Sequence, residues 1–291
     1  MHPSVTVNRP ARSLAVFTIM AGLIPALAFC GMPLFDTHLH YSTSDSESLD
    51  PASVIAILDR NDIYRAVITG TPARHTLDLF QYAPARIVPF LGVYRQPAEK
   101  ATWHRDTTLP ARVEAQLATG HWRGVGELHL FADHRHSPVF RLVVDLAVQH
   151  ELPLLLHCDP AVIDSLYERS PGATVIWAHG GAYPWPPLIR DYLERYPGLY
   201  VDLSVREDRI APDGVMDPDW TTLLMEHAGR FLVGVDTFST RRWQQFDTVT
   251  RDIRRWLAYL PDEVAAGIAH RNAEALFATG KQGSKAGRIR P

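Results

Sequence analysis

Residues 34–40 read Leu-Phe-Asp-Thr-His-Leu-His, and this stretch decides how the rest of the chain is interpreted. Strand side chains alternate between two faces, so a strand here puts Asp36, His38 and His40 on one face. Two imidazoles at i and i+2, at the end of a strand, can point at one spot, and neutral imidazole is a common ligand of divalent metals. The pair alone is weak evidence, because two half-buried histidines with hydrogen-bond partners give the same pattern.

Short apolar runs alternate with helical segments along the rest of the chain. The predicted strands are residues 34–40, 64–69, 87–93, 124–129, 153–157, 173–179, 199–204 and 231–236. The predicted helices are residues 51–60, 75–82, 109–119, 137–150, 161–169, 186–196, 219–228, 241–259 and 261–277. Continuous apolar strands are typical of a parallel sheet that is buried on both faces.

This alternation predicts the α/β class and a (β/α)8 TIM barrel, which needs eight strand–helix units in about 250 residues. A doubly wound open sheet is the alternative, but the first strand lacks the glycine-rich phosphate turn that usually follows it there. The 291 residues suffice for one large barrel, and the composition, 46% hydrophobic and 21% charged, is ordinary for a globular protein. We expect a single domain over residues 31–280 and a flexible tail at 281–291.

Residues 1–30 are predicted to be a leader. Arg9 and Arg12 precede an apolar run, residues 14–29, and the small-x-small sequence Ala26-Leu27-Ala28 lies near its end. A positive flank, an apolar core and small residues in this order describe a secretory signal peptide. We therefore expect export to the periplasm, with membrane contact only through the leader.

Three other interpretations of the leader remain open. A membrane-anchoring or buried helix is disfavoured, because Pro25 interrupts a run shorter than the about 20 residues that a spanning helix needs. A lipoprotein anchored at Cys30 is disfavoured by the bulky Phe29 before it. A chain that truly begins near Met32 would stay in the cytoplasm.

Polar side chains stand at the carboxyl ends of several predicted strands, where the active site of a barrel lies. A single histidine in this place is more often a hydrogen-bonded structural residue than a ligand. Several unpaired polar groups buried at one mouth would cost about 1–3 kcal/mol each, and a divalent cation would compensate for them together. The residues concerned are His38, His40, Glu127, His129, His157, His179, Asp202, Ser204, Arg206 and Asp236.

These segments resemble the amidohydrolase superfamily, specifically its amidohydrolase-2 branch of metal-dependent (β/α)8 hydrolases. The resemblance covers everything after the leader, including a C-terminal helix of the form Asn-Ala-x-x-Leu-Phe at residues 272–277. The other matching pieces are Phe-Asp-Thr-His-Leu-His at 35–40, His157, Trp-Ala-His-Gly-Gly at 177–181 and Gly-Val-Asp-Thr at 234–237.

The resemblance implies a role for each matching residue. His38 and His40 would bind the metal, and His157 would complete the site or bind a second ion. His179 would bind metal or polarise the substrate. Asp236 would bind metal weakly and act as the proton shuttle, first as general base and then as general acid.

The bridging ligand is the point where this chain departs from many relatives, which carry a carboxylated lysine on the fourth strand. The lysines here are Lys100, Lys281 and Lys285, so none stands on that strand. Glu127 would replace it as a bridging carboxylate, as in deoxyribonuclease-like metal hydrolases. The number of ions, one or two, therefore stays open. The nitrogen and carboxylate donors favour zinc, with manganese or iron as alternatives.

Arg206, Tyr183 and Trp185 are candidate substrate contacts. A surface ion pair with Glu207 is the alternative for Arg206, and packing over the barrel rim is the alternative for the two aromatic residues. The net charge of −3 offers no basic field for nucleic acid, so we expect a small-molecule substrate. Assembly into a homo-oligomer is left open.

Three functions compete. The first is metal-dependent hydrolysis of an amide, ester or lactone bond. The second is a metal-dependent decarboxylase of the same branch, which a pocket arginine paired with a substrate carboxylate would favour. The third is an exported binding protein without catalysis, which is ranked last because Asp236 and all the histidines are present.

The leader generates the first prediction. Expressed in a Gram-negative host, the mature protein should be recovered from the periplasm with an N-terminus near Phe29, because export removes the signal peptide. N-terminal sequencing checks this, and a cytoplasmic protein that still starts at Met1 would contradict it.

Overall fold

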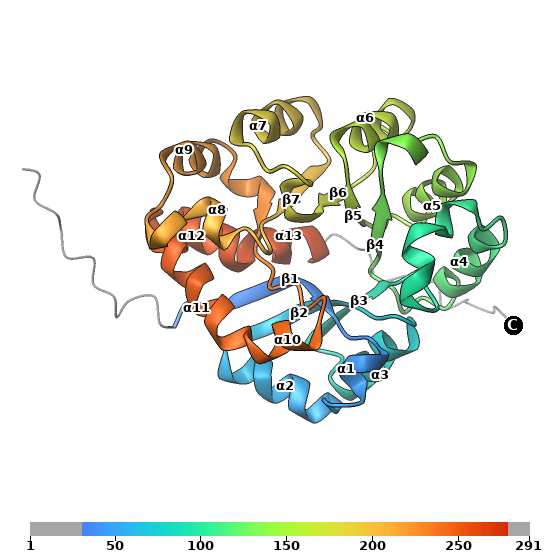
Figure 1. The fold of residues 1–291 in the computed structure, drawn as a ribbon, viewed down its shortest axis with the longest axis horizontal. Helices are drawn as coiled ribbons and strands as arrows, with labels where there is room; N and C mark the ends of the chain where they lie inside the picture. The colour runs from blue at the N-terminus through green and yellow to red at the C-terminus, as the bar shows by residue number, and fades with distance from the viewer. Residues whose placement is uncertain (1–30, 279–291) are drawn as a thin grey trace, which may run out of the picture.

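The computed structural model describes residues 31–278 and shows eight parallel strands arranged as a barrel (Figure 1). The strands follow one another in chain order around the sheet. They are β1 (Leu34–His40), β2 (Ile63–Thr69), β3 (Ile87–Leu91), β4 (Gly124–Leu130), β5 (Leu154–Cys158), β6 (Val175–Trp177), β7 (Leu199–Asp202) and β8 (Phe231–Leu232). The predicted (β/α)8 fold is confirmed. The predicted leader and tail lie outside the described residues.

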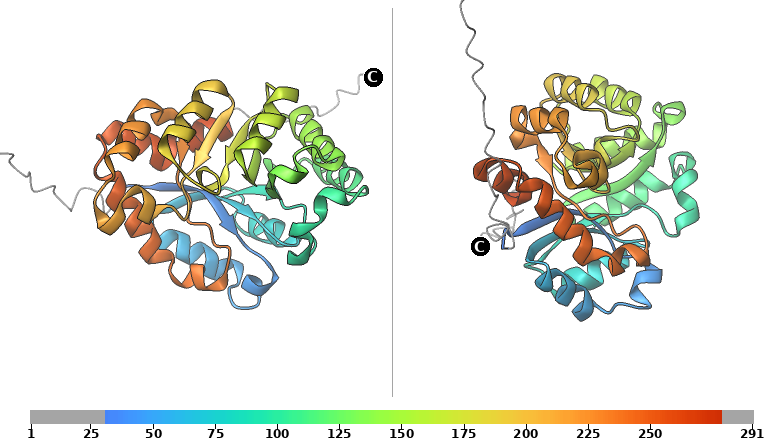
Figure 2. Two further views of the ribbon diagram at one scale, coloured as in Figure 1. Left: turned by 45° about the horizontal axis from the view of Figure 1, so that its top comes forward. Right: turned by 60° about the vertical axis from the view of Figure 1, so that its left-hand side comes forward.

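Helices cover the outside of the barrel in every view (Figures 1 and 2). Proline stands in the first turn of α2, α4, α5, α6, α7 and α9, where its fixed φ suits a helix and its missing N–H costs nothing. No helix between residues 31 and 278 is long and apolar enough to cross a membrane. The helices are α1 (Thr43–Ser46), α2 (Pro51–Arg60), α3 (Arg74–Tyr82), α4 (Leu109–Leu117), α5 (Pro138–Gln149), α6 (Pro160–Arg169), α7 (Pro186–Arg195), α8 (Glu207–Ile210), α9 (Pro218–Glu226), α10 (Thr240–Gln244), α11 (Phe246–Leu257), α12 (Asp262–Ala266) and α13 (Asn272–Ala278).

Four strands end before the residue that the sequence predicts: β3 ends at Leu91 rather than 93, β7 at Asp202 rather than 204, and β6 and β8 also end early. The sequence predicts strands to His179 and to Asp236, but β6 ends at Trp177 and β8 at Leu232. His179 has φ 61° and Asp236 has φ 56°. This left-handed conformation is incompatible with a strand, so the backbone leaves the sheet before each of these residues.

The two C-terminal helical predictions are also broken in the structure. The helix predicted over 241–259 is divided into α10 and α11 at Gln245. The helix predicted over 261–277 consists of α12, a π-helical turn over Gly267–Arg271, and α13. Helical periodicity continues through such turns, so the sequence pattern does not mark them.

The seam between the last and first strands is closed by individual hydrogen bonds. The backbone N–H of Thr37 donates to the carbonyl of Val233 at 2.9 Å, and that of Asp236 donates to His38 at 2.7 Å. The hydroxyl of Thr237 donates to the carbonyl of His40 at 2.7 Å. The segment that carries Asp236 is therefore tied directly to the strand that carries both histidines.

The opposite end of the barrel is filled by aromatic side chains. Phe90 is fully buried, and a Cβ at Gly124 would overlap its ring. Phe277 from α13 packs with ring centroids 5.5 Å from Phe35 and 5.8 Å from Phe90. The side-chain amide of Asn272 donates to the carbonyls of Ala228 and Phe231, which anchors α13 across this end.

Phe90→Ala should lower the free energy of unfolding by about 3–5 kcal/mol, because a large buried ring is replaced by a cavity. The matched control is Phe238→Ala, since Phe238 is 63% exposed; it should change stability by less than about 0.5 kcal/mol. Urea denaturation of both variants measures the difference, and equal losses would contradict the assignment of Phe90 to the core.

Candidate metal centre

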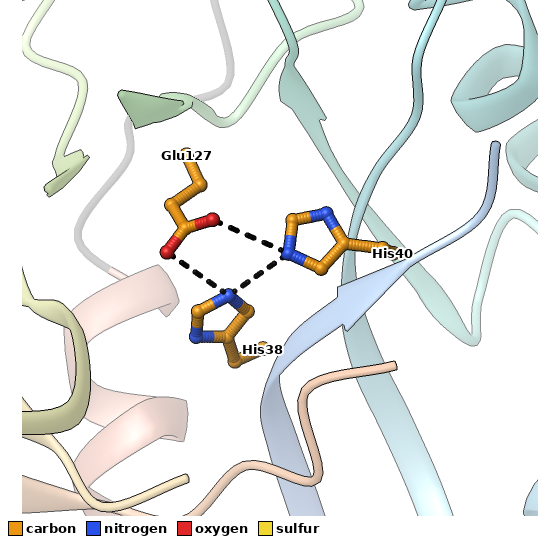
Figure 3. Close-up of side chains that lie close together, drawn as sticks. All are labelled: His38, His40 and Glu127. Atoms are coloured by element: carbon orange, nitrogen blue, oxygen red, sulfur yellow. Dashed lines mark hydrogen bonds and ion pairs between the residues drawn. The ribbon is translucent and has the colours of Figure 1, made fainter. Parts of the chain in front are cut away.

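The carboxyl end of β1 presents two buried histidines to a carboxylate from β4 (Figure 3). The Nε2 atoms of His38 and His40 lie 3.2 Å apart. Glu127 places Oε1 3.7 Å from Nε2 of His38 and Oε2 3.4 Å from Nε2 of His40. The His-x-His pattern of β1 thus converges with Glu127 on one point in the barrel mouth.

Glu127 also faces two histidines from the neighbouring strands. Its Oε1 lies 3.1 Å from Nδ1 of His157, at the end of β5, and 3.5 Å from Nε2 of His179, just after β6. Glu127 therefore belongs to two groups of close ligand atoms, one with His38 and His40 and one with His157 and His179.

Asp236 completes the ring of donors from the segment after β8. Its Oδ1 lies 3.3 Å from Nε2 of His40 and 3.7 Å from Nε2 of His38, and its Oδ2 lies 3.7 Å from Nε2 of His179. The Oδ1 atom is buried without a hydrogen-bond partner. An unpaired buried carboxylate oxygen is costly, so this atom points to a cation as its partner.

The spacing of these atoms fits a divalent metal. Ligand atoms of a tetrahedral ion with bonds of about 2.1 Å lie about 3.4 Å apart. The distances from His40 Nε2 are 3.2 Å to His38, 3.3 Å to Asp236 and 3.4 Å to Glu127. The distances from His40 therefore match the spacing of ligand atoms around a divalent ion.

Residues behind the histidines fix which ring nitrogen is free to bind a metal. Nδ1 of His38 lies 2.7 Å from Asp202, and Nδ1 of His179 lies 3.2 Å from the backbone carbonyl of Ser204. Both acceptors place the ring proton on Nδ1 and leave the lone pair on Nε2, as is usual for metal-bound histidine. Sequence reasoning did not assign Asp202 this role, although a charged residue within an apolar strand was a signal for it.

The electrostatics of the site favour a positive charge at its centre. Burial lowers the pKa of His38, but the negative charges of Asp236, Asp202 and Glu127 outweigh it and raise that pKa to about 10. Burial raises the pKa of Glu127, but the charge on His38 and the surrounding imidazoles hold it well below its ordinary value. Neutral imidazoles around a divalent cation supply the same positive charge.

The three predicted substrate contacts lie in different settings. The guanidinium of Arg206 donates to the backbone carbonyls of Val205, His179 and Gly181 at 3.2, 2.9 and 3.0 Å. The alternative partner, Glu207, pairs instead with Arg242 at 2.8 Å.

Tyr183 and Trp185 lie in the loop before α7 with side chains 85% and 61% exposed, so neither packs closely over the rim. Both are therefore accessible to a molecule that approaches this end of the barrel. Substrate contact by the two aromatic residues and by Arg206 remains a prediction.

A protein-family model described as Amidohydrolase matches residues 35–279. No functionally curated protein matches the sequence. A probable 2-pyrone-4,6-dicarboxylic acid hydrolase from Acinetobacter baumannii with citric acid bound is 16% identical, with a TM-score of 0.58, and the match covers 85% of this chain and 100% of that one.

Two other similar structures are described as TatD-like. A TatD homologue from Escherichia coli is 16% identical, with a TM-score of 0.61 and coverage of 86% and 99% of the two chains. A TatD family hydrolase from Entamoeba histolytica is 10% identical, with a TM-score of 0.54 and coverage of 84% and 99%. At 10–16% identity these structures show only that the fold is shared. The match to the family model rests on the sequence of residues 35–279.

His38→Ala should weaken metal binding at least tenfold, because it removes a buried ligand that Asp202 orients. Elemental analysis and titration of the metal-depleted protein measure the loss, and His150→Ala, an exposed histidine at the end of α5, serves as the control. Active wild-type protein with less than about a tenth of an ion per chain would contradict the metal centre.

Proposed function

Because this chain belongs to the amidohydrolase family and is an enzyme of the hydrolase class, we propose that it cleaves an ester, lactone or amide bond of a small molecule with the help of a divalent metal. One observation carries the proposal. Asp236 Oδ1 is buried without a hydrogen-bond partner, beside the Nε2 atoms of His38 and His40. A carboxylate in that place would serve both as a ligand and as a base for water.

The chemistry divides between the ion and the side chains. A divalent ion in this site supplies Lewis acidity and activates water. His38 and His40 direct their Nε2 atoms toward the ion site, and Asp202 keeps the His38 ring in the tautomer with a free Nε2 lone pair. Glu127 balances the positive charge from the opposite side of the mouth.

Proton transfer falls to Asp236. Burial raises its pKa, but the charges on His38 and His40 bring that pKa down to about 2. Asp236 is therefore ionised at neutral pH, so it can accept a proton from the attacking water and return it to the leaving group.

Zinc is the proposed metal, with manganese or iron as alternatives, because the donors are imidazole and carboxylate. Two ions are the favoured number. The support is Glu127, whose two oxygens face different histidines: Oε2 lies nearest His40, and Oε1 lies nearest His157.

Decarboxylation is the second candidate, and Arg206 is the residue that would pair with a substrate carboxylate. Three of its five N–H donors bind backbone carbonyls, which leaves one on each terminal nitrogen for such a substrate. These bonds hold the turn that contains His179. Assays for carbon dioxide and for hydrolytic products on the same substrates separate the two reactions.

We propose export to the periplasm on the strength of the leader sequence alone. Tyr183 and Trp185 are proposed to contact an apolar part of the substrate, because large exposed aromatic side chains at an active-site mouth favour such contacts.

Asp236→Asn should keep most of the metal and the fold while kcat falls by about 10²–10⁴-fold, because the amide cannot accept the proton from water. Kinetics on a panel of esters, lactones and amides, together with metal analysis, measure the effect. Asp133→Asn, the same change at an exposed position after β4, is the control. A near wild-type kcat for Asp236→Asn would remove Asp236 from proton transfer and point to His179 as the base.

A further inference from the structure

We infer that His129 is a positioning residue that fixes the rotation of the Glu127 carboxylate, and thereby the two groups of metal ligands. His129 follows Glu127 by two residues on β4 and reaches the same mouth. Its Nε2 lies 3.4 Å from Oε2 of Glu127. The inference rests on the proposed metal centre, and it assigns a role to a residue outside the set of ligands argued above.

The ring of His129 is held from behind by Tyr94, which is buried. The Tyr94 hydroxyl oxygen accepts the backbone N–H of His129 at 2.8 Å, and it also lies 3.4 Å from Nδ1 of the same residue. The indole N–H of Trp103 donates to the backbone carbonyl of His129 at 2.7 Å. The backbone and the ring of His129 are therefore both fixed.

These contacts determine the tautomer of His129. An ionised Glu127 only accepts hydrogen bonds, so the contact between Oε2 and Nε2 calls for a proton on Nε2, and the Tyr94 O–H is then free to donate to Nδ1. Nδ1 then carries the lone pair, and the single proton of the neutral ring sits on Nε2. Nε2 is the ring atom that faces Oε2 of Glu127, at 3.4 Å.

A fixed donor matters because the terminal torsion of a glutamate has a broad, weakly defined minimum. The observed rotation places Oε1 toward His157 and His179 and Oε2 toward His40. A hydrogen bond to Oε2 selects this rotation before any ion arrives. The His129 ring also stacks on that of His157, with centroids 4.5 Å apart, so it orients a second member of the site.

Two isosteric substitutions separate positioning from packing. The amide nitrogen of Gln reaches the place of Nε2, so His129→Gln keeps a donor for Glu127. The shorter Asn side chain reaches only the place of Nδ1, so His129→Asn loses it. Both variants keep the backbone bonds to Tyr94 and Trp103, and their metal-free forms should unfold at the same temperature.

The experiment is titration of the metal-depleted full chain with Zn²⁺ in competition with a chromogenic chelator. Loss of an oriented outer partner typically costs 10–100-fold in metal affinity, and we expect that loss for His129→Asn. His129→Gln should stay within about threefold of wild type, since its hydrogen bond survives. The number of ions bound at saturation is read from the same titration.

Equal affinities for the Asn and Gln variants, whether both are weakened or both are unchanged, would overturn the positioning role. The measured affinities do not depend on turnover. A wild-type protein that binds Zn²⁺ but hydrolyses none of the substrates refutes the proposed function and leaves this inference standing. A wild-type protein that binds no Zn²⁺ overturns both.

Discussion

A buried carboxylate surrounded by imidazoles is the constraint on which this structure depends. Five histidines lie within 3.7 Å of the Glu127 oxygens, and they come from β1, β4, β5 and the turn after β6. So many donors and lone pairs cannot all be satisfied by one another around a buried carboxylate. A divalent cation would resolve the conflict, because it pairs with carboxylates and neutral nitrogens together.

Much of the fold could be predicted because the barrel is a repetitive structure. Each strand is a continuous apolar run, and each is followed by a helix, many with proline in the first turn. The ends of β6 and β8 could not be predicted, since His179 and Asp236 adopt a left-handed conformation that their apolar neighbours do not signal. The positions at the strand ends identified the candidate ligands, but the ring nitrogen that His38 and His179 present depends on Asp202 in β7 and on Ser204 just after it.

Stability and chemistry are placed at opposite ends of the barrel. Phe35, Phe90 and Phe277 fill one end with aromatic packing that requires no polar partner. The other end contains the carboxylates and imidazoles, whose burial is unfavourable until a cation joins them. The stability gained by aromatic packing at one end therefore offsets the cost of burying polar side chains at the other.

Because hydrogen bonds join the first and last strands, the site forms only when the whole barrel is present. The strand with His38 and His40 emerges first during synthesis, whereas Asp236 and Thr237, which bind to that strand, come near the end. A fragment with only the first four strands would hold His38, His40 and Glu127 without the carboxylate that closes the ring. Half of this barrel therefore carries three candidate ligands but lacks Asp236, the carboxylate that we propose as the base, so the complete site exists only once the last strand is in place.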